Sequence, residues 1–289
     1  MKLRLSFAAL SLALVSPARP AADANNSRRL DTTVITEVTD SGRRHAAAVS
    51  AATPAYYVLL PIAYRERGAA QEGKKLATED FAWPLQQALK ELGFRPATRE
   101  HPPTVALSCI LGSHYMIDMD NDAGSAEQGF RNILDRAALA GGEKFARELA
   151  AAIKQSEDAD NAASRSAGPS GSVGAAAGLA QMSAVANPVK LFKQRSPQNE
   201  FLVDQATSNC YYVVVSAYAY ASLATPQKEL LWRTRMTARV DVVSQLDSLA
   251  TLVALGGAYF GREMNESHTA RTPVVRFAEL ANPPITPEH

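Results

Sequence analysis

The sequence lacks a strong net charge, a late apolar run and a recognisable catalytic motif. Its 30 basic and 29 acidic residues leave a formal net charge of +1, so the chain has no basic field of the kind that a general nucleic-acid-binding protein carries. After residue 24 no stretch has the length and apolar content of a transmembrane helix. We therefore expect neither a nucleic-acid partner nor a membrane-spanning segment.

No constellation of catalytic or metal-binding residues stands out. The five histidines are scattered, without the spacing of metal ligands, and no phosphate-binding glycine loop is present. Asp118, Asp120 and Asp122 match the opening of a calcium loop, but Ala123 and Gly129 stand where that loop needs glycine and glutamate. We expect no catalytic residue, no metal and no cofactor, and we interpret the acidic run as a solvated loop.

The chain has only two cysteines, Cys109 and Cys210, both in apolar, strand-like stretches. In an oxidising compartment they could form one disulfide closing a loop of about 100 residues, worth at most ~4–5 kcal/mol in the chain-entropy model. The alternative is two buried free thiols that act as small hydrophobic groups. Both alternatives stay open, because the sequence gives no Cα separation. A catalytic cysteine is not favoured, since neither has an activating pattern around it.

Residues 1–24 have the pattern of a cleavable secretory signal peptide. Lys2 and Arg4 form a basic start, residues 5–15 are an apolar run, and residues 22–24 (Ala-Asp-Ala) offer the small-residue site that a signal peptidase needs. The apolar run is little more than half of the about 20 residues that span a bilayer. We expect cleavage after residue 24 and a periplasmic or secreted protein.

Alternating and helical patterns predict a single α/β domain over residues 54–280. The expected strands cover residues 56–64, 104–111 and 209–221, and the last of these forms a hairpin with a strand over 230–243. The expected helices cover residues 78–92, the segment 129–155 with a break at Gly141-Gly142, and a segment beginning near Leu246. The fold class is α+β: a two-layer α/β sandwich with helices on one face of a largely antiparallel sheet.

Three other segments are expected to be flexible. Residues 25–53 are polar and alanine-rich, with a first or edge strand at 32–39. Residues 156–187 are a low-complexity run of Ala, Ser and Gly that buries too little apolar surface to offset its ordering entropy. Residues 281–289 form a proline-rich tail that we expect to be disordered.

Side-chain alternation on the expected hairpin predicts a candidate binding face. One side of strand 209–221 is aliphatic, and Trp232 and Met236 on the returning strand suit the same core. The opposite side then carries three tyrosines and three arginines: Tyr212, Tyr218, Tyr220, Arg233, Arg235 and Arg239. Such a face can stack on sugar rings, hold anionic head groups or accept acidic side chains. The alternative is a solvated face whose Tyr–Arg pairs satisfy one another across the strands.

Two segments resemble a recurring unit of exported bacterial cell-envelope proteins of unknown function, many of them lipoproteins. One is residues 81–94 (FAWPLQQALKELGF) with residues 103–107 (PTVAL), and the other is residues 228–236 (KELLWRTRM). The resemblance covers about a third of the chain. It implies a two-layer α/β sandwich that serves as an envelope accessory or assembly factor, and it carries over no catalytic residue. The chain lacks the anchor cysteine of the lipoproteins.

The leading functional expectation is a non-catalytic accessory or binding protein of the bacterial cell envelope, with an envelope component or a protein as its partner. Two alternatives come from other classes. One is a hydrolase acting on envelope material, with Asp118, Asp120 and His114 near its site. The other is a self-associating structural protein.

Overall fold

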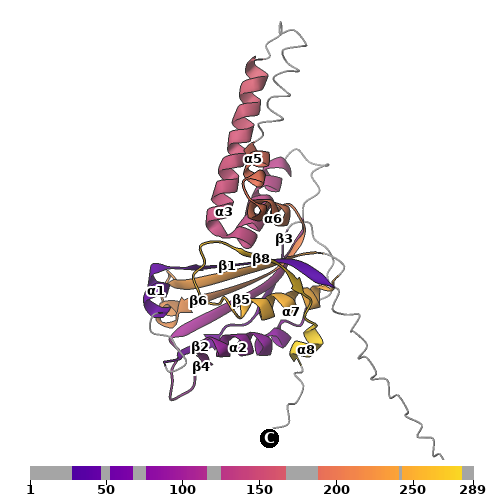
Figure 1. Ribbon diagram of the computed structural model, residues 1–289. Coiled ribbons are helices and arrows are strands. Elements are labelled where there is room, and N and C mark those ends of the chain that lie inside the picture. The colour runs from indigo at the N-terminus through magenta and orange to yellow at the C-terminus, as the bar shows by residue number, and fades with distance from the viewer. Residues whose placement is uncertain are drawn as a thin grey trace, which may run out of the picture.

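The computed structural model describes residues 28–46, 53–67, 76–115, 125–166, 188–240 and 243–281. Within them eight strands form one sheet, and helices lie on both sides of it (Figure 1). The strands are β1 (Arg29–Val38), β2 (Ala55–Leu59), β3 (Ala63–Arg67), β4 (Phe94–Pro96), β5 (Val105–His114), β6 (Cys210–Ala219), β7 (Leu230–Arg239) and β8 (His268–Pro273). The helices are α1 (Asp40–Ala46), α2 (Ala82–Glu91), α3 (Ser125–Ser166), α5 (Pro188–Gln194), α6 (Pro197–Ala206), α7 (Gln245–Gly256) and α8 (Phe277–Ala281), with 3-10 turns η2 (Thr78–Phe81) and η3 (Tyr220–Ala224).

The sheet is open and mixed, which confirms the expected α+β class. Its strand order is β4-β2-β5-β6-β7-β1-β8, and β3 pairs with β5 beyond the end of β2. The pairs β5–β6, β6–β7, β7–β1 and β1–β8 are antiparallel, whereas the pairs β2–β4, β2–β5 and β3–β5 are parallel. The predicted hairpin is β6–β7, with η3 inside its connection.

The sequence predicts a flexible segment over residues 25–53 with a first or edge strand at 32–39, and strand β1 corrects this expectation. It lies inside the sheet, between β7 and β8. Its threonines made the segment look polar, but their hydroxyls are paired across the sheet. The Oγ1 atoms of Thr33 and Thr237 lie 2.6 Å apart, and those of Thr36 and Thr234 lie 2.8 Å apart. Buried hydroxyls that bond to each other cost little, so a threonine-rich strand can be internal.

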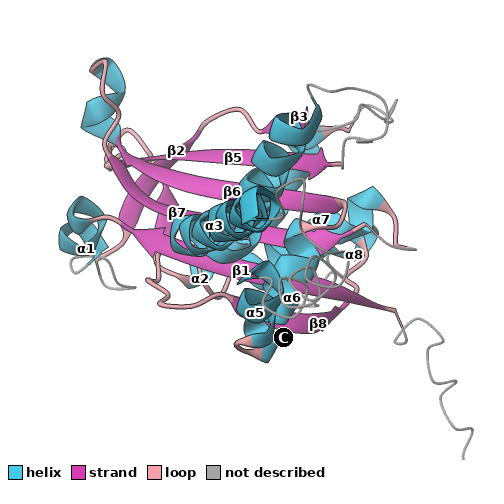
Figure 2. Ribbon diagram, turned by 90° about the horizontal axis from the view of Figure 1, so that it is seen from above, coloured by secondary structure: helices cyan, strands magenta, loops and turns pink. Residues whose placement is uncertain are grey.

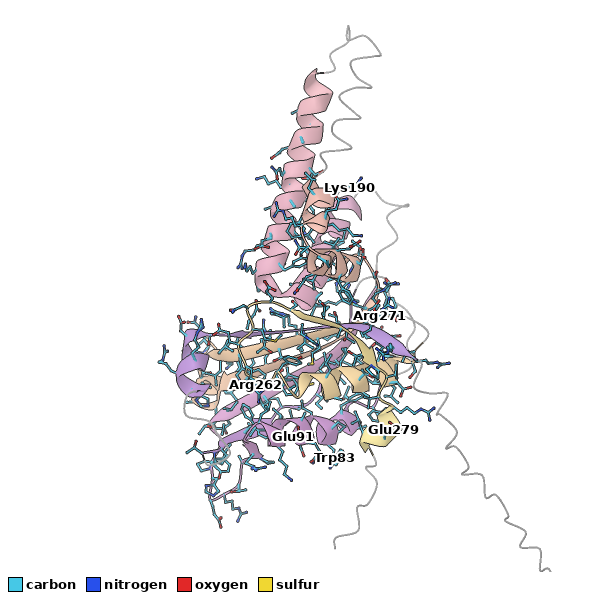
Figure 3. The ribbon with its side chains drawn as sticks, viewed as in Figure 1. Trp83, Glu91, Lys190, Arg262, Arg271 and Glu279 are labelled. Carbon is cyan, nitrogen blue, oxygen red and sulfur yellow. The ribbon has the colours of Figure 1, made fainter. Side chains whose placement is uncertain are left out.

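The apolar core lies between one face of the sheet and helices α2, α7 and α8 (Figures 1 and 3). Leu85 and Leu89 of α2 and Leu249 and Leu252 of α7 are fully buried against it. These helices follow the apolar spacing seen in the sequence. Gly93 has a φ of 85° immediately after α2, where a left-handed residue ends a helix. The sheet and these helices form the two layers that the sequence predicts.

A second group of helices lies on the other face of the sheet, so the prediction of helices on one face only is wrong. The sequence predicts α3 as a helix but not its position on this face. Helix α3 passes over β6 and β7, and α5 and α6 lie beside it toward β1 and β8 (Figure 2). Helix α3 is broken at Gly142, which has φ 79° and ψ 179°, so the predicted break at Gly141-Gly142 is confirmed. The three helices share a core of their own, built from Ala137, Ala140, Phe145, Leu149, Ala152, Phe192, Leu202, Val203 and Ala206.

The predicted flexible insertion 156–187 begins too early. Residues 156–166 continue α3, whose end projects away from the sheet (Figure 1). This stretch contains three alanines, three serines and three acidic residues, and its alanines favour continuation of the helix. Residues 167–187 lie outside the described residues, as do the expected signal peptide, the acidic run at residues 118–122 and the tail after Ala281.

Candidate functional site

The hairpin β6–β7 divides its side chains between the two faces of the sheet as the sequence predicts. Val213, Val215 and Ala217 lie in the apolar core with Trp232 and Met236. On the opposite face Ser216 stands beside Arg233, and Val214 stands beside Arg235. We call this opposite side the polar face.

Four of the six predicted binding residues line one groove between the polar face and α3. They are Tyr212, Tyr218, Arg233 and Arg235. The groove encloses about 300 Å³. Its remaining lining comes from β3, β5, β6 and α3: Arg65, Arg67, Ser108, Ile110, Val214, Ser216, Asp135, Ala138, Leu139 and Glu143. We refer to it as the arginine–tyrosine groove.

The other two predicted residues lie elsewhere. Tyr220 begins η3, beyond the end of β6, and is 42% exposed. Arg239 is at the opposite end of the hairpin, across from Cys210, and its guanidinium lies 3.8 Å from the Asp31 carboxylate. That carboxylate also accepts a hydrogen bond from Arg271, which is labelled on β8 in Figure 3. The six residues therefore form one compact group of four and two outliers.

Helix α3 is held over the polar face by ion pairs on both sides of the groove. On the β3 side Arg67 binds Asp135 at 3.1 Å. On the other side Arg235, which is 5% exposed, binds Glu143 at 2.5 Å and also binds Glu37 of β1. These contacts make α3 the roof of the groove.

Glu37 also fixes the break in α3. Its Oε1 accepts a hydrogen bond of 2.9 Å from the backbone N–H of Glu143, the first residue after the break. The left-handed Gly142 brings the chain so close that a Cβ there would lie 3.0 Å from the same oxygen. A carboxylate at the start of a helical segment satisfies a free N–H and complements the helix dipole. Glu37 therefore joins β1, β7 and α3 at one point.

Arg233 and Arg65 differ from the two paired arginines of the groove. The Nε–H of Arg233 donates to Ser216 Oγ at 3.0 Å. The β1 residue opposite Arg233 is Glu37, but the Glu37 carboxylate binds Arg235 and the Glu143 backbone N–H instead. Neither Arg233 nor Arg65 forms an ion pair with a carboxylate of the described residues. Two guanidinium groups are thus available on the groove.

Tyr212 closes the inner end of the groove. It is 3% exposed, its hydroxyl donates to the Arg65 carbonyl at 3.2 Å, and burial raises its pKa. The ring lies over Gly112, where a Cβ would collide with it and with the Arg65 carbonyl. Farther along, Ser108, Ile110 and Val214 are only half-buried. The groove is therefore closed by Tyr212 at one end and lined by part-exposed residues toward Tyr218.

Behind Tyr212 lies a buried cluster around His114. His114 and Arg136 of α3 are each 1% exposed. Arg136 donates to His114 Nδ1 at 3.3 Å and to the Ala206 carbonyl at 2.6 Å. Burial and the Arg136 charge lower the pKa of His114 to about 4, so the ring is neutral at pH 7. His114 fixes α3 to β5 and is enclosed, so it does not meet a substrate there; Asp118 and Asp120, its partners in the hydrolase hypothesis, lie outside the described residues.

The two cysteines are free, which overturns the disulfide alternative. Cys109 lies in the apolar core opposite Val215, whereas Cys210 pairs with His114, five residues farther along β5. Five residues of strand span about 17 Å, and a disulfide needs Cα atoms within about 7 Å. Burial raises the pKa of both thiols to about 12, so neither is an activated nucleophile.

A larger cleft of about 1030 Å³ lies between the helices of the polar face and the β1–β8 side of the sheet. Phe145, Phe201 and Leu202 line it together with polar residues of α6 and the loop before β8. Gln198 crosses it by donating to the Ser267 carbonyl at 2.6 Å. It contains none of the predicted arginines or tyrosines, so the arginine–tyrosine groove remains the candidate site.

Three further findings concern metal binding, membrane spanning and similarity to known proteins. Across the described ranges no group of three His, Cys, Asp or Glu side chains is placed to hold a metal ion. Among the helices of those ranges, none is long and apolar enough to cross a bilayer. The chain matches no protein-family model and no curated protein. Fold and site together define an α+β protein with an open mixed sheet and a helix-roofed polar face.

Proposed function

We propose that the protein is a non-catalytic binding protein of the bacterial cell envelope, exported as the pattern of residues 1–24 predicts, and that its ligand occupies the arginine–tyrosine groove. The observation that carries the proposal is the convergence of Tyr212, Tyr218, Arg233 and Arg235 with two further arginines on one concave site. Concave sites with a few placed polar groups are the usual location of ligands.

The polar side chains of the groove suit binding better than catalysis. Its four arginines hold oxyanions through fixed donors and do not exchange protons near neutral pH, and its two carboxylates, Asp135 and Glu143, are paired with Arg67 and Arg235. The nearest histidine is enclosed behind Tyr212, and both thiols are buried. A site of this kind recognises a partner through hydrogen bonds, charge and ring stacking.

The binding part of the proposal is tested with two matched double variants. Arg233→Gln with Tyr218→Ala changes the groove, and Arg239→Gln with Tyr220→Ala changes the same residue types outside it. Each protein is applied to a panel of purified envelope glycans, lipids, peptidoglycan fragments and proteins. We expect a component that binds the wild type and the control but not the groove variant. Equal binding by all three proteins on every component would refute the assignment of the site.

The export part of the proposal is tested separately. Expressed from its own sequence in a Gram-negative host, the protein should appear in the periplasmic fraction or the medium with Asn25 as its first residue. N-terminal sequencing and fractionation give the result. Protein that keeps Met1 and stays in the cytoplasm would contradict export without affecting the groove.

A further inference from the structure

The arginine–tyrosine groove carries positive charge that the carboxylates of the described residues do not fully neutralise. Its four arginines are Arg65, Arg67, Arg233 and Arg235, and three described carboxylates pair with them. Asp135 is used by Arg67, and both Glu37 and Glu143 are used by Arg235. The surplus is one positive charge beside a partly apolar surface. Taking water away from such a charge is costly unless a bound anion pairs with it, so a ligand that covers this surface should supply a negative charge.

Arg233 is the best-placed anchor for that anion. Its Nε is fixed by Ser216 at 3.0 Å, and its backbone lies in the centre of the sheet, between β6 and β1. The two terminal nitrogens are left as a fork on a guanidinium whose orientation is already set. A planar fork matches the two oxygens of a carboxylate, and an orientation set in advance lowers the entropic cost of binding.

The apolar part of the groove suits a ring. Ile110 and Val214 form an aliphatic floor two residues along the strands from Ser216 and Arg233, and Leu139 of α3 and the half-buried Tyr218 also line the groove. Aliphatic and aromatic side chains of this kind pack on the faces of sugar and aromatic rings. The volume of about 300 Å³ is at the small end of ligand pockets and suits one ring with its substituents.

We infer that the groove binds a ring-bearing monocarboxylate, with the carboxylate on Arg233 and the ring between Leu139 and the floor of Ile110 and Val214. This inference rests on the proposed binding function and names its ligand class. One surplus positive charge matches one carboxylate, whereas a phosphate dianion would leave the groove negative. Two sources share this chemistry: an acidic sugar such as a uronic acid, and an aromatic acid.

The test is calorimetric titration of the purified protein with glucuronate, benzoate, glucose and inorganic phosphate. We expect glucuronate or benzoate to bind, and which of the two binds more tightly identifies the source. Glucose and phosphate should bind at least about tenfold more weakly, because each lacks either the charge or the ring. The inference is wrong if neither carboxylate binds, or if phosphate binds as tightly as the better carboxylate.

Variants locate the carboxylate. Arg233→Gln should weaken binding about tenfold or more, since a charge-assisted pair is lost. Arg233→Lys keeps the charge without the fork and should lie between the wild type and Arg233→Gln. Arg239→Gln, on the same strand but outside the groove, should bind as the wild type does. Wild-type affinity in Arg233→Gln would overturn the inference. Unfolding midpoints of each variant verify that the fold is intact, and Arg233→Lys serves as the probe if the glutamine variant does not fold.

The outcomes separate this inference from the proposed function. If neither carboxylate binds, but an envelope component binds and is lost in Tyr218→Ala, the ligand class is wrong and the binding function stands. If no component of the panel depends on the groove, the binding function itself fails.

Discussion

The two faces of the sheet are stabilised in different ways. On the apolar face, Leu249, Leu252 and the helix α2 leucines pack against aliphatic strand residues, and burial of apolar surface is the main stabilising effect. On the polar face, α3 is attached through Arg67–Asp135, Arg235–Glu143 and the His114–Arg136 cluster. Long charged side chains join α3 to the strands without filling the space between them, and the arginine–tyrosine groove is that space. One face therefore supplies stability, and the other supplies a shaped site.

The polar face itself shows the difference between a structural and an available arginine. Arg235 and Arg233 are two residues apart on β7 and point to the same side. Arg235 is buried between two carboxylates, whereas Arg233 has only the Ser216 hydroxyl. The four predictions below test the comparison of the two faces or that of the two arginines. They run from the largest expected effect to the smallest.

The largest effect is expected on the apolar face. Leu249→Ala removes a fully buried side chain of α7 and should lower the free energy of unfolding by about 2–5 kcal/mol. Urea denaturation measures it. Leu191→Ala is the matched control, because Leu191 of α5 is 48% exposed and its truncation should change stability by only about 0.5 kcal/mol or less. Equal losses in both variants would show that α7 does not cover the core.

Acid should weaken the polar face through His114. The pKa of its ring is lowered from 6.5 to about 4, because burial and Arg136 disfavour the charged form. Arg67 acts in the same direction, whereas Asp135 and a backbone hydrogen bond with Tyr115 oppose it. As the pH falls below 6.5, the His114 ring is protonated in the unfolded chain before it is protonated in the folded one. The free energy of unfolding therefore falls by about 3 kcal/mol between pH 6.5 and pH 4, and it levels off at lower pH.

The His114 contribution is measured as a difference between proteins. His114→Gln keeps an acceptor for Arg136 but does not titrate, so its unfolding free energy should depend less on pH than that of the wild type over this window. His101→Gln changes an exposed histidine and should reproduce the wild-type curve. Parallel curves for the wild type and His114→Gln would contradict the buried neutral ring.

Arg235 and Arg233 should differ in their effect on stability. Arg235→Ala leaves Glu37 and Glu143 without their partner and detaches α3 from β7, so we expect a loss of about 2 kcal/mol. Arg233→Ala removes one hydrogen bond of a half-exposed side chain and should cost about 0.5 kcal/mol. Chemical denaturation of both variants gives the comparison. A larger loss for Arg233→Ala would reverse the structural roles assigned to the pair.

Reduction should have no effect. Cys109 and Cys210 are free and lie on opposite faces of the sheet, so the thermal midpoint should be the same with and without reductant. Alkylation after unfolding without reductant, followed by intact mass measurement, should show two modified thiols. If the only species observed is the unmodified protein, Cys109 and Cys210 form a disulfide, and the register of β5 and β6 is contradicted.

Much of the apolar layer could be predicted from local patterns. Helical spacing gave α2 and α7, alternation gave the β6–β7 hairpin and its buried side, and Gly141-Gly142 gave the break in α3. The roof of the groove could not be predicted this way. It depends on contacts such as Arg67 with Asp135, which are 68 residues apart, and Arg235 with Glu143, which are 92 apart. The single strand predicted over residues 56–64 is two strands, β2 (Ala55–Leu59) and β3 (Ala63–Arg67), and the alternation along β3 places Arg65 and Arg67 on the same side.

The amino-acid sequence by itself determined which side chains of each strand and helix share a face, because that depends only on the backbone repeat of 2 or 3.6 residues. Tertiary structure decided which other segments of the chain each face contacts. It placed β1 inside the sheet, so that Glu37 neutralises Arg235 and not its cross-strand neighbour Arg233. It also separated the two cysteines and laid α3 over the tyrosines and arginines. Charge neutralisation depends on distances between segments remote in sequence, and only the folded chain sets those distances.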